Sequence, residues 1–171
     1  MPDRRHLWRG IHDPDMVASG LTPRFTADAR RARFELTNSG IGHAFPTYVT
    51  PKAAMNAVAL DAQGRPRPET AVSHVIQRRV VSENDTWIEK SDTRLLPGET
   101  AALDIPWGDA RRVRIWLEVH PDDFYDHDVY DELLRLLPKG SPAARLIAVA
   151  DGQARESRFR LFESEIERPA R

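Results

Sequence analysis

The chain has 171 residues, of which 40% are hydrophobic and 30% charged, and its formal net charge at pH 7 is −1. This composition is typical of one folded domain with a core of its own and excludes disordered and fibrous chains. Because the sequence contains no cysteine, it also excludes a disulfide framework, a thiolate nucleophile, a cysteine-based zinc site and covalent haem attachment through C-x-x-C-H.

The charge pattern and the hydropathy exclude two kinds of partner. The 22 Arg and 3 Lys alternate with 26 acidic residues and form no basic stripe, so nucleic acid is not an expected partner. No apolar stretch approaches the ~20 residues that a bilayer crossing needs, and the first residues lack the apolar region of a signal peptide. Neither a membrane span nor a signal peptide is predicted in this chain.

Residues 1–20 are predicted to form an irregular, polar N-terminal arm. Asp13 is a suitable N-cap for a short helical turn at Pro14–Ser19, the only regular element expected in this segment. Residues 21–171 are predicted to form a single domain.

Strand patterns follow one another from Leu21 to His120. The clearest is Arg112–His120, in which Val113, Ile115, Leu117 and Val119 alternate with polar or larger residues. The other predicted strands are Ala32–Leu36, Lys52–Asp61, one long strand at Thr70–Val81, Thr86–Lys90 and Thr100–Ile105. Strands at this spacing, without helices between them, indicate an antiparallel, immunoglobulin-like β-sandwich of about seven to eight strands.

The periodicity becomes helical near residue 122. Asp122–Leu137 places Tyr125, Val129, Leu133 and Leu137 on one face and predicts an amphipathic helix. Ser141 and Pro142 are suited to begin a second helix, which continues to Ala150 and ends at Gly152. We expect these two helices to form an insertion at about 122–151 in the sandwich, after which Ser157–Glu163 returns to the sheet as a strand.

Two histidine-bearing segments are candidates for binding. His120, Asp123 and His127 lie where a strand leads into a helix, and they are the candidate metal ligands. The alternative is that the acidic residues there satisfy the free N–H groups of the helix N-terminus, with His127 on the solvated face.

The second segment is the loop Gly40–Tyr48, in which two glycines and Pro46 present His43 among aromatic residues. His43 is suited to be a ligand or a stacking partner there. The alternative is a tight loop between strands whose Phe45 fills one end of the sandwich.

The sequence contains no catalytic constellation. It has no G-x-S-x-G elbow, no glycine-rich phosphate loop and no serine with an evident histidine and acid partner. No catalytic residue is predicted, and an enzyme is not the favoured interpretation.

Four segments in this order resemble the C-terminal β domain of bacterial multihaem cytochrome c proteins. Together they extend over nearly the whole chain. They are Met1–Asp13, Leu36–Thr47 with its Gly-His-Ala-Phe-Pro-Thr, Asp92–Glu99 with its Leu-Pro-Gly-Glu, and Glu118–Tyr125 with its Val-His-Pro-Asp-Asp. The resemblance implies a periplasmic, electron-transfer context and makes His6, His12 and His43 candidate axial ligands or packing residues for haem groups.

The absence of C-x-x-C-H motifs separates this chain from that family. No haem is expected to be attached covalently to it, so the resemblance implies haem c carried by a missing segment or by a cytochrome partner. We expect a fragment of a longer cytochrome in preference to a stand-alone descendant that has lost its haems. The alternative function is a cofactor-free binding module that presents Trp8, Trp87 or Trp116, and association into oligomers is compatible with either function.

Overall fold

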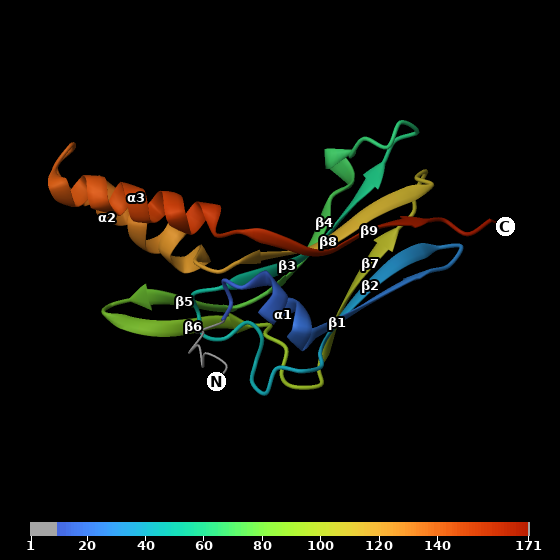
Figure 1. Ribbon diagram of the computed structural model, residues 1–171, viewed down its shortest axis with the longest axis horizontal. Coiled ribbons are helices and arrows are strands. Elements are labelled where there is room, and N and C mark those ends of the chain that lie inside the picture. Colours follow the sequence, from blue (N-terminus) through green and yellow to red (C-terminus); the bar gives the residue numbers. More distant parts are fainter. Residues whose placement is uncertain (1–9, 171) are drawn as a thin grey trace, which may run out of the picture.

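The computed structural model describes residues 10–170, apart from the side chain of His127. In this range the chain forms two antiparallel sheets packed face to face, a separate hairpin and a group of helices (Figure 1). The predicted mainly β, antiparallel sandwich is confirmed, with nine strands in the described residues. The elements are α1 (Pro14–Gly20), β1 (Leu21–Ala27), β2 (Arg31–Asn38), β3 (Lys52–Leu60), η1 (Pro68–Thr70), β4 (Val72–Ile76), β5 (Arg78–Glu83), β6 (Thr86–Asp92), β7 (Thr100–Pro106), β8 (Arg112–His120), η2 (Tyr125–Tyr130), α2 (Asp131–Leu136), α3 (Pro142–Glu156) and β9 (Phe159–Glu167).

The two sheets are β1-β2-β7 and β4-β3-β8-β9. Strand β1 was not among the individually predicted strands, because Pro23 and the polar residues of Leu21–Ala27 weaken its alternation. The last predicted strand does return to the sheet as β9, which pairs with β8 and runs four residues further than expected, to Glu167.

The core lies between the sheets and follows the alternation of each strand. The four aliphatic residues predicted to share one face of β8 are all fully buried, and so are the inward residues of β2. Phe34 and Leu36 of β2 belong to the same hydrophobic cluster as Leu103 and Ile105 of β7 and Met55 of β3. Burial of one face fixes the register of β2 with β7, since a slip of one residue would expose the whole set.

The helical turn predicted at Pro14–Ser19 is confirmed as α1. The Asp13 carboxylate accepts a hydrogen bond from the Met16 backbone N–H at 3.0 Å, and Pro14 occupies the first turn. The sequence did not predict that this segment reaches the core, but Val17 is buried in it. Residues 14–20 therefore belong to the packed structure rather than to an irregular arm.

The single long strand predicted at Thr70–Val81 is wrong. It divides at Gln77 into β4, at the edge of the four-stranded sheet, and β5, which pairs only with β6. Thr93 causes the division: its Oγ1 accepts from the Gln77 N–H at 3.0 Å and lies 2.9 Å from the Val75 carbonyl oxygen, to which it donates. Thr93, sixteen residues after Gln77, thus forms hydrogen bonds with backbone groups that a continuous strand would use for pairing.

The continuous α-helix predicted from Asp122 to Leu137 is also wrong in detail. Residues Tyr125–Tyr130 form a π-helical turn, η2, and a regular α-helix follows only as α2. Asp126 in this turn is 1% exposed, and both Arg155 and Arg158 pair with its carboxylate. Widening the turn places this carboxylate inside, where the two guanidinium groups neutralise it.

The second predicted helix is confirmed at its start and wrong at its end. Ser141 Oγ accepts from the Ala144 N–H at 3.1 Å, as an N-cap does. Gly152 does not stop the helix, which runs to Glu156 and carries the ion pair between Arg155 and Asp151 across its last turns.

The β5–β6 hairpin and the helices extend from the same end of the sandwich (Figure 1). The rings of Trp87 on β6 and Phe124, just before η2, lie 5.9 Å apart and join the two. We call the β5–β6 hairpin and the segment from η2 to α3 the two arms of the molecule.

Candidate functional site

Asn38, at the end of β2, organises the loop that carries His43. Its side chain is fully buried, and its Nδ2 donates to the carbonyl oxygens of His43 (2.9 Å) and Leu95 (3.0 Å). Its Oδ1 accepts from the Ile41 N–H at 3.1 Å. Both the nitrogen and the oxygen of the Asn38 amide thus have hydrogen-bond partners. These bonds hold the loop against the sandwich, although the loop has little regular secondary structure.

Phe45 closes the same loop onto the core. Its backbone exchanges two hydrogen bonds of 2.8 Å with Leu95, and its ring is buried in the hydrophobic cluster. The alternative noted from the sequence, that Phe45 fills one end of the sandwich, therefore describes this loop correctly. It does not conflict with a role for His43, whose side chain is on the exposed side.

His43 is held in one orientation by its own loop. Its Nδ1 lies 3.0 Å from the Ala44 carbonyl oxygen and 3.0 Å from Thr47 Oγ1. The contact with Ala44 is a hydrogen bond in the tautomer that carries the hydrogen on Nδ1, because a carbonyl oxygen only accepts, whereas the Thr47 hydroxyl can donate to Nδ1 or accept from it. In that tautomer the lone pair of the neutral ring is on Nε2, which is the state that a metal-ligating histidine needs.

A small, mostly apolar hollow of about 170 Å³ adjoins His43. Its other lining residues come from the N-terminal segment, α1 and the loop: Gly10, Ile11, Met16, Val17, Ile41, Phe45 and Thr47. The segment just before α1 and the His43 loop therefore meet at one end of the sandwich.

His12 has a different environment from His43. Its Nε2 lies 2.8 Å from Asp122 Oδ2, so the nitrogen that would reach a metal is occupied by a carboxylate. The pair fixes the N-terminal segment to the junction between β8 and η2. His6, the third predicted haem-contacting histidine, lies outside the described residues.

Two members of the predicted metal cluster do lie together. His120 Nδ1 is 3.5 Å from Asp123 Oδ1, while His120 Nε2 is 2.7 Å from Glu118 Oε1. Lys52 Nζ is 2.5 Å from the same Asp123 oxygen, and this ammonium opposes a second cation there. The side chain of His127 lies outside the described part of the chain, in which no group of three or more histidine, cysteine or acidic residues is placed to hold a metal.

The network around His120 lowers the pKa of both carboxylic acids that face it. Burial raises the pKa of Asp123, but His120 and Lys52 lower it more, to about 2. Burial likewise raises the pKa of Glu118, and its contacts with His120 and Trp116 outweigh that effect and lower it. Both groups are carboxylates at neutral pH, and the network is an ion-pair cluster.

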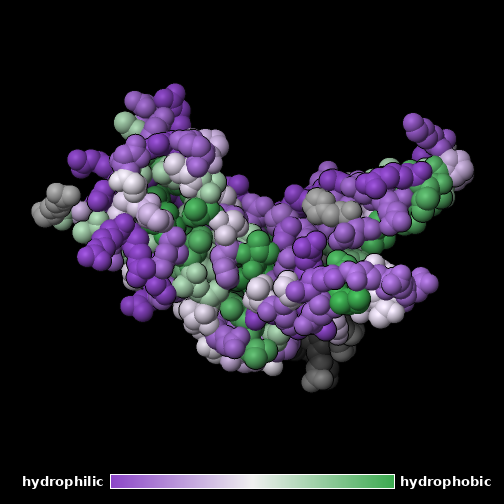
Figure 2. Space-filling model, turned by 180° about the vertical axis from the view of Figure 1, so that it is seen from behind, coloured by the Kyte–Doolittle hydropathy of each residue, from purple (hydrophilic) through white to green (hydrophobic). Residues whose placement is uncertain are grey.

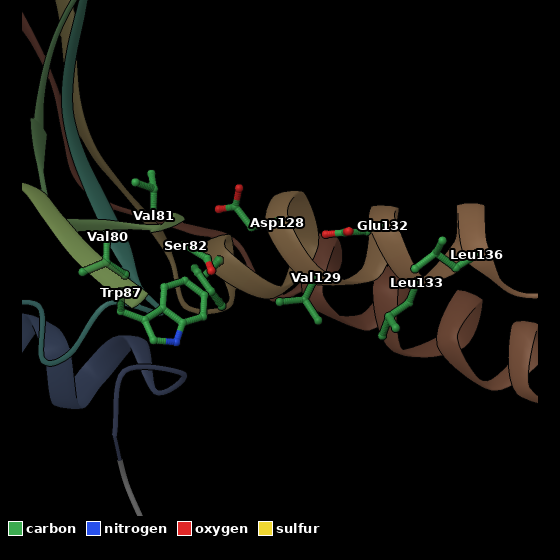
Figure 3. A pocket seen from close by; sticks show the side chains of 10 residues that line it. Val80, Val81, Ser82, Trp87, Asp128, Val129, Glu132, Leu133 and Leu136 are labelled. Carbon is green, nitrogen blue, oxygen red and sulfur yellow. The ribbon is translucent and has the colours of Figure 1, made fainter. Parts of the chain in front are cut away.

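The structure also contains a groove that the sequence analysis did not predict. It has a volume of about 530 Å³ and lies between the β5–β6 hairpin and the helical arm (Figure 3). Its lining consists of Val80, Val81, Ser82, Trp87, Phe124, Asp128, Val129, Glu132, Leu133 and Leu136. Hydrophobic residues also reach the surface along the two arms in the back view (Figure 2). In the sequence, only the apolar residues Val80, Val81 and Trp87 pointed to this groove. They lie in β5 and β6, which pair with each other outside the two sheets of the sandwich.

The tryptophans differ in exposure. Trp87 is 63% exposed in the groove, whereas Arg160 covers the ring of Trp116 with its guanidinium carbon 4.6 Å from the ring centroid. Trp8 lies outside the described residues. Of the two tryptophans that the structure describes among these three, Trp87 is thus the more exposed.

Within the described residues, no helix is long and apolar enough to cross a membrane. No protein-family model matches the chain, and no curated protein matches it significantly.

The fold is similar to part of a solved structure, the penta-heme cytochrome c552 from Thermochromatium tepidum. The TM-score is 0.58 at 16% sequence identity, and the match covers 93% of this chain and 42% of that chain. At this identity the similarity concerns the fold alone. The chain spans less than half the length of that cytochrome.

Proposed function

We propose that this chain is the accessory, haem-packing β domain of a multihaem c-type cytochrome that transfers electrons, and that it is not catalytic by itself. The observation that carries the proposal is the agreement between the sequence motifs and the fold. Sequence segments spread over nearly the whole chain resemble the β domain of multihaem cytochromes, and the fold matches part of a penta-heme cytochrome over 93% of the chain.

The haem c in this proposal belongs to a haem-bearing segment or partner, since this chain has no cysteine to attach one. When bound, the haem carries the electron, and the protein sets its ligation, burial and orientation. The resemblance to c-type cytochromes also supports a periplasmic location.

Among the candidate ligands, the geometry favours His43. Its Nδ1 faces the Ala44 carbonyl oxygen and the Thr47 hydroxyl, and with the hydrogen on Nδ1 the lone pair of Nε2 is available to a metal. His12 instead uses Nε2 for Asp122, so we assign it the role of fixing the N-terminal segment. Asn38 is a positioning residue, because it holds the backbone of the His43 loop.

A haem c peptide that carries its own proximal histidine tests this assignment. Mixed with the full chain, the peptide should change from the high-spin spectrum of a haem with one histidine to the low-spin spectrum of a haem with two. The variant His43→Ala should lose this change, whereas His12→Ala and His74→Ala should keep it. Addition of free imidazole should restore the low-spin spectrum with His43→Ala.

An unchanged haem spectrum with the wild-type chain would refute haem ligation by this domain. An identical response from His43→Ala and the wild type would remove His43 as the ligand. The alternative function, a cofactor-free binding module, has its own support in the exposed Trp87 of the groove. It predicts ligand binding without any spectral effect on haem.

A further inference from the structure

We infer that the groove between the two arms is a docking site for an amphipathic, basic α-helix of a partner protein. Soluble proteins rarely expose a contiguous apolar patch without a function. In this groove Trp87 is 63% and Leu136 73% exposed, on opposite walls. This inference concerns a surface apart from His43 and does not depend on haem ligation.

The helical wall of the groove has the spacing of a helix-packing seam. Val129, Leu133 and Leu136 all line it, separated by four and three residues (Figure 3). This is the spacing by which one helix presents side chains to another. At 1.5 Å per residue the seam is about 10 Å long, which suits an incoming helix of at least about two turns.

The opposite wall supplies an aromatic and aliphatic surface. Val80 and Val81 of β5 and Trp87 of β6 line it, and Phe124 lies at the base, in contact with Trp87. Aromatic residues are the usual anchors of protein interfaces, because they bury much area at little cost in conformational entropy. A helix lying between the walls would cover both Trp87 and the seam.

The charges of the groove specify a basic partner. Its charged lining residues are Asp128 and Glu132, both on the helical wall. Arg155 pairs with Asp126, Asp131 and Asp151, but no ion pair among the described residues reaches Asp128 or Glu132. These two carboxylates disfavour an anionic ligand such as a haem with its propionates, and they favour lysine or arginine beside the apolar face of a helix.

The lining of the groove contains no basic residue, but a hollow beside it contains three. Lys52, Arg78 and Arg79 line that second space, of about 290 Å³, together with Asp123 and Asp128. Lys52 is paired with Asp123 and Arg78 with Glu89. None of the three basic residues lines the groove proper, whose charged lining residues are the two carboxylates.

Two synthetic helical peptides test the inference with the full chain. Both have leucine at heptad positions a and d; the remaining positions are lysine in one peptide and glutamate in the other. We expect the lysine peptide to bind at least about tenfold more tightly, with a change in tryptophan fluorescence that the Trp87→Ala variant lacks, and its binding to weaken as salt is added. Anisotropy of a label on the peptide gives both affinities.

Variants locate the site. Trp87→Ala, Leu136→Asp and Glu132→Lys should each weaken binding of the lysine peptide about tenfold. Leu146→Asp is the matched control, because Leu146 is 71% exposed on α3 and does not line the groove. Circular dichroism confirms that each variant is folded, which is expected for exposed positions.

Equal weakening by Leu146→Asp and Leu136→Asp would show non-specific adsorption and overturn the inference. So would an unchanged affinity in all three groove variants, or equal binding of the two peptides. If haemin displaced the lysine peptide from the wild type but not from the Trp87→Ala variant, the groove would be a haem surface and the helical partner would be wrong. The His43 experiment has a spectral readout, so either proposal can fail without the other.

Discussion

His12 Nε2 and Asp122 Oδ2 lie 2.8 Å apart although the two residues are separated by 110 positions in the sequence. The contact joins the segment before α1 to the start of the helical arm. The residues next to His12 line the His43 hollow, and Phe124, two residues after Asp122, lines the groove. The contact therefore links the segments that form these two sites.

His12→Ala should release this segment without unfolding the domain. The His12 side chain is 59% exposed, and exposed ion pairs contribute about 0.5 kcal/mol, so the free energy of unfolding should change little. The amide of Asp13, which donates to the Gly10 carbonyl oxygen, should instead exchange its hydrogen faster. Hydrogen exchange measured by NMR checks both expectations.

Asp122→Ala should have the same effect, and the double variant should add nothing to either single change. Full additivity of the two substitutions would contradict a direct contact between these side chains.

Asn38→Ala should lower the free energy of unfolding by about 3 kcal/mol. The substitution removes the side-chain partner of the His43 carbonyl oxygen and of the Ile41 N–H, and one of the two donors to the Leu95 carbonyl oxygen, around a side chain that is itself fully buried. Urea denaturation followed by fluorescence measures the loss. NMR of the His43 imidazole should show that the Nδ1 contacts with Ala44 and Thr47 are lost together with the loop geometry.

Asn56→Ala on β3 is the matched control, since the Asn56 side chain is half-buried and donates one hydrogen bond, to the Ala54 carbonyl oxygen. Its cost should be about 1 kcal/mol. Equal costs for the two asparagines would mean that the His43 loop does not depend on Asn38.

Asp123 should make the protein sensitive to acid in a defined pH range. Its pKa is about 2 in the folded protein against an ordinary 3.8. A lowered pKa stabilises the fold above the pKa of the unfolded chain, and the contribution is lost as the pH falls from about 4 to about 2. The shift corresponds to about 2 kcal/mol at neutral pH.

The variant Asp123→Asn removes this carboxylate. It should therefore be about 2 kcal/mol less stable than the wild type at pH 7, and the two proteins should approach each other in stability at pH 2. Urea denaturation at a series of pH values measures the difference. A difference that stays constant from pH 7 to pH 2 would contradict the predicted role of Asp123.

The sequence predicted correctly those elements whose bounds depend on residues within the element itself. The alternation in Arg112–His120 predicted β8 to the residue, since burial of one face of a strand follows directly from period two. Asp13 and Ser141 predicted the starts of α1 and α3, because an N-cap satisfies backbone N–H groups within three residues.

The candidate site was predictable only in part. The glycines and Pro46 around His43 indicated a presented histidine, and the structure adds the contacts of its Nδ1 with Ala44 and Thr47. His12 was proposed as equivalent to His43, but only the fold reveals Asp122 beside it. The groove could not be predicted, because its two walls come from segments more than forty residues apart.

The sequence by itself determined the antiparallel β class, the N-caps of α1 and α3 and the buried face of β8, because those features arise from interactions between residues close in the chain. The tertiary structure alone decided where Thr93 divides β4 from β5 and where Arg155 and Arg158 widen the turn around Asp126. In each case a polar partner distant in sequence satisfies a buried or unpaired group. That gain outweighs the local preference for a continuous strand or a regular helix.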